Sequence, residues 1–259
     1  MDCGGGSRFL FAEEAAPDGV VKDSSSGVFV EDTPSLPVNL VIADSEGFLN
    51  AAGSFLVNSF WLGSDHHMLK ENMKLTDDAR MNLVIEQAAD LNDKYGERLG
   101  QRLAQACVVG ALDEESNELI GLATLNEALL MNNNVLESEK SEAIAKNAVA
   151  ALGPKQRRIY KGASMTKIAE ELLSPDCKAV CVLSNLAVSR TARRMGVARA
   201  LCNELELLSR DWGYTELHLL VESKNAAART LYTNKLGYKE VTTKEDRKST
   251  RLNSSHANI

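Results

Sequence analysis

Apolar residues recur along this chain with two different periods, and these periods predict a series of strands and helices. Residues 38–42 form a short apolar run that predicts a strand, and Ser45 is placed to cap the helix after it. Apolar residues spaced by three and four predict amphipathic helices over 48–60 and 76–95. Two further strands are predicted within 106–125, joined as a hairpin by an acidic turn.

The chain after residue 178 is more strongly patterned. An apolar strand is predicted over 179–188, followed by a helix over 194–212 whose inward positions are apolar. Alternating apolar residues over 217–221 predict another strand, Asn225 is placed to cap a short helix, and a last strand is predicted over 238–243. The order β-α-α-β-β-insertion-β-α-β-α-β predicts an α/β fold, with a mixed sheet flanked by helices on both faces.

Three segments fall outside this pattern. Residues 1–37 contain glycine and serine runs and three prolines, so we expect disorder, and they carry no signal or transit peptide features. Residues 126–178 are polar and predict a helical insertion. Its basic cluster could meet an acidic partner, but a solvated face is the simpler interpretation for Lys155, Arg157, Arg158 and Lys161. Residues 246–259 read DRKSTRLNSSHANI, which is similar to a translated sequencing-library adapter, so we expect a non-native, unstructured tail and a lost natural C-terminus.

Composition narrows the classes of ligand. The 259 residues are 44% hydrophobic and 25% charged, as in ordinary globular proteins, and no apolar run is long enough to span a membrane. A net charge of -7 argues against nucleic acid as a partner, so a phosphorylated ligand would need a local basic patch. No metal site is predicted, and the odd number of cysteines predicts free thiols for Cys3, Cys107, Cys177, Cys181 and Cys202.

A candidate phosphate loop lies between the strand over 179–188 and the next helix. Residues 193–198 read RRMGVA and lead directly into that helix, whose N-terminal N–H groups suit a pyrophosphate. Gly196 would let a ligand approach the backbone. Local positive charge comes from Arg190, Arg193, Arg194 and Arg199. This loop alone is a weak signal, because a plain strand-to-helix turn also explains it.

A second motif follows, and together the two resemble the GNAT superfamily of N-acetyltransferases. Residues 225–232 read NAAARTLY and are followed by Leu236-Gly237-Tyr238, similar to the family's N-x-x-A-x-x-L-Y…G-[YF], while the loop is similar to its [QR]-x-x-G-x-[GA]. The resemblance is specific over 183–238 and only topological over 38–125. It implies one GNAT domain over 38–245 with a mostly antiparallel sheet. The sequence LSNLAV at 183–188 and the insertion are also similar to the plastid branch of plant and algal GNAT enzymes, which implies a chloroplast location, with the cytoplasm as the alternative.

The resemblance implies a site for acetyl-CoA, the co-substrate of the family. Leu186, Ala187 and Val188 would bond its pantetheine arm like an added β-strand. The loop backbone would hold the pyrophosphate, which extends the implied binding set to Arg193, Arg194, Met195, Gly196, Val197, Ala198 and Arg199. Asn225 would contact the arm or only cap its helix.

The resemblance also implies a general acid. Tyr232 matches the tyrosine that protonates the departing thiolate, since a phenol keeps its proton at neutral pH; a core tyrosine is the alternative. The base is not identified: Glu222 and His218 are the candidates and would act through water, but an ordinary surface or capping role explains each of them equally well. Ser184 and Asn185 stand where some relatives keep a glutamate, which argues against a directly placed carboxylate.

The function predicted from these motifs is transfer of an acetyl group from acetyl-CoA to a primary amine. The acceptor is expected to be a protein N-terminus or a lysine, hence a protein or peptide, with no membrane partner. A non-catalytic acyl-CoA-binding sensor or scaffold is the alternative. A dinucleotide-dependent oxidoreductase is excluded, because no G-x-G-x-x-G follows a strand.

Overall fold

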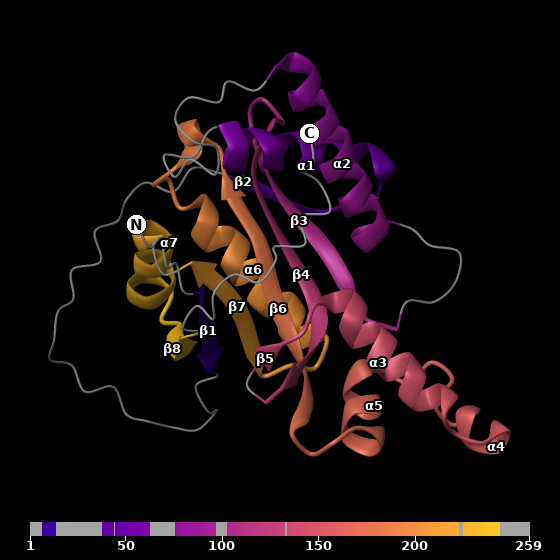
Figure 1. Cartoon of the computed structure of the whole chain (residues 1–259). Helices are drawn as coiled ribbons and strands as arrows, with labels where there is room; N and C mark the ends of the chain where they lie inside the picture. The colour runs from indigo at the N-terminus through magenta and orange to yellow at the C-terminus, as the bar shows by residue number, and fades with distance from the viewer. Residues whose placement is uncertain are drawn as a thin grey trace, which may run out of the picture.

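An eight-stranded sheet lies at the centre of the molecule, with helices on both faces (Figure 1). The computed structural model describes residues 7–13, 38–43, 45–62, 76–96, 103–132, 134–222 and 225–243. Neighbouring strands pair antiparallel except for one parallel pair, so the expected mixed, mostly antiparallel sheet is confirmed. The strand order is β2 (Val38–Ile42), β3 (Ala106–Asp113), β4 (Leu119–Met131), β6 (Cys177–Val188), β7 (Glu216–Glu222), β1 (Ser7–Glu13) and β8 (Lys239–Thr243), with β5 (Asn134–Val135) paired to β4.

The helices follow the predicted order along the chain. Between β2 and β3 lie α1 (Glu46–Leu56), the π-helical turn η1 (Val57–Leu62) and α2 (Asp77–Tyr95). Between β5 and β6 lie α3 (Ser138–Ala150), α4 (Pro154–Arg157) and α5 (Met165–Leu172). The C-terminal part contains η2 (Arg190–Ala192), α6 (Val197–Asp211), α7 (Ala226–Thr230) and the π-helical turn η3 (Leu231–Lys235).

Neighbouring residues of β4 show which helices cover which face. A side chain at Gly121 would meet Val197 and Leu201 of α6, at 2.7 and 3.0 Å. The next residue, Leu122, is instead buried in a cluster with Leu49 and other residues of α1 and α2. Because successive side chains of a strand point to opposite faces, α6 covers one face of the sheet here and α1 and α2 cover the other.

The N-terminal prediction is wrong for one segment. Ser7–Glu13 forms β1, which pairs antiparallel with both β7 and β8. The average composition of 1–37 concealed the short apolar run at residues 9–11, which can extend a sheet once two strand edges are available to it. The tail at 246–259 lies outside the described residues.

The insertion is helical, but its predicted bounds were too wide. Strand β4 continues to Met131 and β6 begins at Cys177, so both strands extend into the range 126–178. The helices α3 and α5 bury residues such as Met165 and Ile168 in a cluster that includes Leu129 of β4. The members of the basic cluster are all exposed, which agrees with a solvated face and also leaves them accessible to an acidic partner: Lys155, Arg157, Arg158 and Lys161.

Four cysteines are described, and all of them are free: Cys107, Cys177, Cys181 and Cys202. Burial raises the pKa of the Cys107, Cys181 and Cys202 thiols to about 12, so these groups stay protonated at neutral pH. The described residues include no group of histidines, cysteines and carboxylates placed to hold a metal ion. Among the helices described, none is both long and apolar enough to cross a membrane.

The packing of α1 against α2 depends on a glycine. A Cβ at Gly53 would lie 2.7 Å from the backbone nitrogen of Ala88, whereas one at Gly47 on the same helix would meet nothing within 4 Å. We expect Gly53→Leu to lower the free energy of unfolding by about 1–3 kcal/mol, as overpacking of a core does. Gly47→Leu is the matched control and should cost nothing in urea unfolding. Equal losses in the two variants would contradict this role for Gly53.

Candidate active site

The parallel strands β6 and β7 pair over only part of their length. Their residue pairs run from Cys181–Leu217 to Leu183–Leu219. Beyond that point β6 continues along β4 to Val188, and β7 continues along β1. The two strands therefore part after Leu183, and among the described strands nothing pairs with the facing edges of the parted ends. Such an edge can accept an extended chain through backbone hydrogen bonds.

A β-bulge lies where the strands part. Asn185 and Leu186 together stand opposite Ala123 of β4, so β6 carries one extra residue here. Asn185 has a positive φ of 52°, which asparagine tolerates better than most residues, and its side-chain amide donates to the Thr124 hydroxyl over 3.3 Å. Because a bulge re-aims the strand after it, the predicted pantetheine-binding residues Leu186, Ala187 and Val188 lie on the segment that it redirects.

The candidate phosphate loop leads from this segment into α6. Gly196 is the N-cap of α6, with a φ of 85°, and Arg194 also has a positive φ, of 67°. The predicted start at Arg194 is therefore wrong, because a helix cannot run through two left-handed residues. The sequence analysis explained Gly196 by the close approach of a ligand to the backbone. The structure adds a second reason for a glycine at this position, since glycine adopts a positive φ without strain.

The loop carries exposed positive charge on an otherwise acidic protein. Its four arginines are all exposed: Arg190, Arg193, Arg194 and Arg199. The Arg193 Nε donates to the Val188 carbonyl oxygen over 3.3 Å, which ties the loop to the end of β6. Within the binding set, Gly196 is also exposed, Met195 and Ala198 are partly buried, and Val197 is buried. The N-terminal end of α6 thus combines a helix dipole, unpaired N–H groups and arginine side chains, which is suited to a pyrophosphate.

Asn225 and Tyr232 lie on the helical segment after β7. The Asn225 side-chain oxygen accepts a hydrogen bond from the Ala228 amide at 3.0 Å, so the capping role predicted for it is confirmed. Tyr232 is 6% exposed and belongs to the same buried cluster as Leu219 and Val221 of β7.

The Tyr232 hydroxyl has no hydrogen-bond partner among the described residues, although its ring is well packed. The ring packs edge-on against Tyr238, with centroids 5.6 Å apart. Burial raises the pKa of Tyr232 above its ordinary value, so the phenol holds its proton at neutral pH. This protonation state suits a general acid and equally a core tyrosine, so the acid role stays a prediction.

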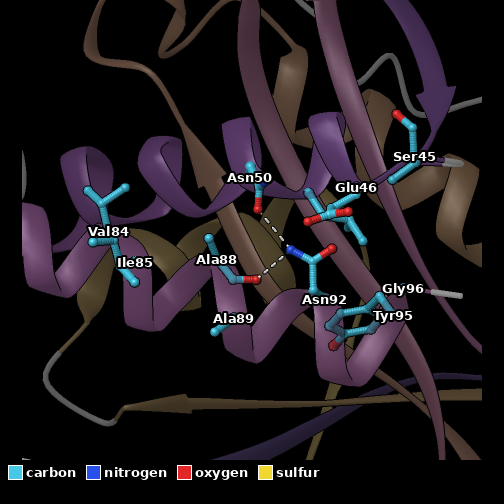
Figure 2. Close-up of a pocket in the computed structure, with 12 residues that line it drawn as sticks. Ser45, Glu46, Asn50, Val84, Ile85, Ala88, Ala89, Asn92, Tyr95 and Gly96 are labelled. Atoms are coloured by element: carbon cyan, nitrogen blue, oxygen red, sulfur yellow. Dashed lines mark hydrogen bonds between the residues drawn. The ribbon is translucent and has the colours of Figure 1, made fainter. Parts of the chain in front are cut away.

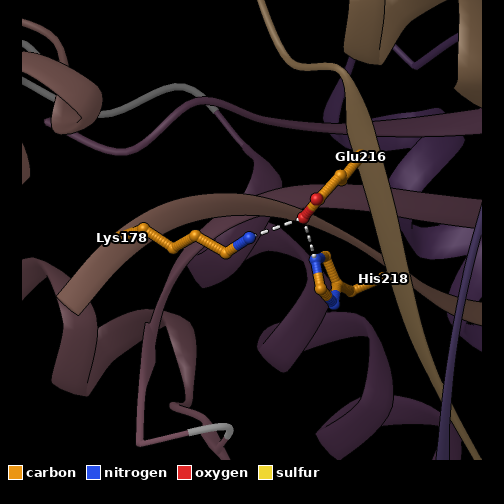
Figure 3. A network of polar contacts seen from close by, with 3 residues as sticks. All are labelled: Lys178, Glu216 and His218. Atoms are coloured by element: carbon orange, nitrogen blue, oxygen red, sulfur yellow. Dashed lines mark hydrogen bonds and ion pairs between the residues drawn. The ribbon is translucent and has the colours of Figure 1, made fainter. Parts of the chain in front are cut away.

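Of the two candidate bases, only the side chain of His218 is described. It is 5% exposed, and its Nε2 lies 3.3 Å from a carboxylate oxygen of Glu216, to which the Lys178 ammonium also donates over 2.6 Å (Figure 3). Burial lowers the pKa of His218, while Glu216 opposes that shift, so the imidazole is neutral and able to accept a proton near pH 7. Glu222 ends β7, but its side chain lies outside the described part of the chain.

A cleft of about 380 Å³ opens beside the bulge, and the sequence analysis missed it. Its lining comes from six separate segments: the end of α2, the starts of β3 and α3, and parts of β4, β6 and β7. No local pattern predicts such a site, since these segments meet only in the folded sheet. The residues nearest the bulge are Ser184 and Asn185, with Leu220 on the strand that has parted from them.

A larger groove, of about 1060 Å³, lies between α1 and α2 (Figure 2). Its lining comes from these two helices and the residues next to them, and not from β6 or β7. The Asn92 side-chain amide of α2 bridges to α1 by donating to Asn50 Oδ1, and it also donates to the Ala88 carbonyl of its own helix, each over 2.9 Å (Figure 2). The groove is thus a feature of the helix pair, and it shares Tyr95 with the lining of the cleft beside the bulge.

The part of the chain that contains the candidate site matches a known protein family. Residues 155–238 match the model of the Acetyltransferase (GNAT) family. This part of the chain is similar to the GNAT family. The matched range contains the bulge, the phosphate loop, Asn225 and Tyr232, so it includes every residue of the predicted site. The GNAT resemblance seen in the two motifs is therefore supported. The finer likeness to the plastid branch is not.

The chain is also weakly similar to several solved structures. A functionally unknown conserved protein from Staphylococcus epidermidis is 7% identical, over 93% of this chain and 59% of its own, with a TM-score of 0.44. A proposed acetyl transferase from Pyrococcus furiosus is 13% identical, over 82% of this chain and 99% of its own, with a TM-score of 0.45. A predicted acetyltransferase from Clostridium acetobutylicum, solved with acetyl-CoA, is 11% identical over 79% of this chain and 92% of its own, with a TM-score of 0.38. This chain thus spans about 59% of the length of the Staphylococcus protein. No curated protein matches the sequence.

Proposed function

We propose that this protein is an acyltransferase that moves the acetyl group of acetyl-CoA to a primary amine. The observation that carries the proposal is the parting of β6 from β7 directly before the glycine-capped N-terminus of α6. An open strand edge suits an amide-containing arm, and a helix N-terminus suits phosphates, so the two features together suit one ligand that has both. The family match over 155–238 supports the same ligand.

The residues of the site fit acetyl-CoA in type and order. Leu186, Ala187 and Val188 would offer backbone groups to the pantetheine amides. Residues 193–199 would offer backbone amides and arginine charge to the pyrophosphate, with the left-handed Gly196 leaving room for it. Asn225 would reach the arm only in addition to capping α7. When bound, the thioester supplies an acetyl carbon that an amine can attack.

The chemistry requires two proton transfers. A base must first take a proton from the ammonium form of the acceptor, and His218 is the candidate that the structure leaves neutral. The amine nitrogen then forms a bond to the acetyl carbon as the carbon–sulfur bond breaks. Tyr232 would donate its phenolic proton to the departing sulfur, and the proton released by the amine would replace it through solvent. The products are an amide and free coenzyme A.

The acceptor and the location are finer proposals, and the sequence resemblance alone supports them. By that resemblance the acceptor is the N-terminal amine or a lysine of a protein. The chloroplast is the proposed location, with the cytoplasm as the alternative.

The proposal is tested with the whole protein, acetyl-CoA and a library of peptides that carry one free amine each. We expect acetyl-CoA to bind in calorimetry, and free thiol to appear at a rate that depends on the peptide. Mass spectrometry then identifies the acetylated amine. Binding without amine-dependent thiol release would favour the sensor or scaffold alternative, and no binding would overturn the proposal.

A further inference from the structure

The cleft beside the bulge opens onto the gap between the parted strands. In β4, Gly121 and Leu125 face α6, so Asn126, which lines the cleft, faces the opposite side. In β7, Leu219 belongs to the cluster on the α6 face, so Leu220 also points to the cleft side. The phosphate loop enters α6, on the other face. An acceptor can therefore approach the gap through the cleft without crossing the proposed coenzyme A site.

The outer wall of the cleft comes from the insertion. The strand β5 and the first turns of α3, residues 134–142, bring Glu137, Glu139 and Glu142 to the lining. Opposite them, the end of α2 contributes Lys94. Three carboxylates and one ammonium therefore line a cleft that meets the reacting end of the proposed site.

The three carboxylates differ in the hydrogen bonds and ion pairs that they form within the protein. Glu142 pairs with Lys146 at 2.9 Å and accepts a hydrogen bond from the Leu103 amide at 3.1 Å. Glu137 and Glu139 are exposed, and among the described residues their carboxylates form no hydrogen bond and no ion pair. The Lys94 ammonium pairs with Asp90 at 2.8 Å on its own helix, and Glu139 also attracts it, so this one cation is shared and offsets the charge of the two exposed carboxylates only in part. The two exposed carboxylates thus leave negative charge at the rim.

We propose that residues 134–142 of the insertion select the acceptor, through Glu137 and Glu139, for an amine with a second positive charge in the same molecule. This inference rests on the proposed acetyl transfer and adds the substrate class. Two carboxylates at the mouth of a cleft attract a dication and reject an acceptor with a neighbouring negative charge. The amine that reacts goes to the gap, and the second cation stays at the rim.

Two peptide sets test this preference. One set has a free N-terminal amine and no lysine, and the other has a blocked N-terminus and a single lysine. In each set the neighbouring residue is arginine, glutamine or glutamate. For the set that the enzyme accepts, kcat/KM with the arginine peptide should exceed that with the glutamine peptide by about 5-fold, and the glutamate peptide should be poorest.

Variants locate the source of the preference. In E137Q/E139Q the arginine-to-glutamine ratio of kcat/KM should fall to about 1, since two carboxylates of this kind account for a few-fold effect. The matched control is E114Q/E115Q, which removes the same charge from the exposed β3–β4 turn and should keep the wild-type ratio. Thermal melting checks that each variant is folded, and Glu139→Lys gives an independent single change that should reverse the preference.

The outcomes separate this inference from the proposed function. Transfer without any preference for the arginine peptide overturns the selection and leaves acetyl transfer standing. A preference that survives E137Q/E139Q, or that E114Q/E115Q removes equally, also overturns it, since the charge would then act from elsewhere. Loss of acetyl transfer to every peptide, measured beside acetyl-CoA binding, overturns the proposed function and this inference with it.

Discussion

Replacing Tyr232 by Phe is expected to lower kcat by about a hundredfold to ten-thousandfold, the usual contribution of a general acid. The change deletes only the hydroxyl, which has no hydrogen-bond partner in the described structure, and keeps the ring packed against Tyr238. Melting temperature and acetyl-CoA affinity should therefore stay near their wild-type values. Turnover is measured at saturating acetyl-CoA and acceptor, with pre-steady-state kinetics showing that the chemical step limits the rate.

Tyr238→Phe is the matched control for this prediction. Tyr238 belongs to the same buried cluster, but its hydroxyl donates to Glu206 over 2.8 Å, so its loss should cost about 1 kcal/mol of stability and leave kcat unchanged. If Tyr232→Phe keeps more than about a third of the wild-type rate, the tyrosine serves packing alone and the general acid lies elsewhere.

Gly196→Trp is expected to abolish acetyl-CoA binding in calorimetry. Gly196 is exposed at the N-terminus of α6 with a φ of 85°, where the proposed pyrophosphate would lie against the backbone. An indole there would occupy that space. The left-handed conformation costs an L-residue roughly 1–2 kcal/mol, a loss that a folded domain should survive.

Gly196→Ala separates the two effects. Alanine has the same backbone cost with little bulk, so it should lose the same stability and retain measurable binding. Equal acetyl-CoA affinities for wild type and Gly196→Trp would remove the phosphate site from this loop. Unfolding of both variants to the same degree, measured by circular dichroism, would instead assign the glycine to the turn alone.

Local signals in the sequence predicted most of the helices and their caps. Ser45 accepts a hydrogen bond from the Phe48 amide and Asn225 accepts one from the Ala228 amide, as N-cap side chains do. The 3.6-residue period placed α1, α2 and α6 within a few residues of their observed bounds. The predicted start of α6 was wrong. The positive φ of Arg194 keeps this residue out of the helix, and this φ depends on how the chain turns after β6 and not on the type of residue.

The strand pattern needed more than local information. Residues 179–188 predicted β6, yet nothing local indicates that it pairs with β7 only as far as Leu183, since pairing depends on two segments that are distant in sequence. The resemblance to the GNAT family implied only that residues 186–188 bond an extended arm, which requires the open strand edge that the structure shows. The bulge at Asn185 likewise appears only in the register between β4 and β6.

The sequence by itself determined the type and order of most elements, and it pointed to the candidate phosphate loop and to the tyrosine of the second motif, because each of these signals depends on residues within about one turn or strand. Only the tertiary structure decided that Ser7–Glu13 fills the space between β7 and β8, and that Glu137 and Glu139 border the cleft at the bulge. Both are contacts between distant segments. Such contacts depend on the strand edges and sheet faces that are still uncovered after the sheet has formed. The hydrophobic pattern of a single segment therefore does not predict them.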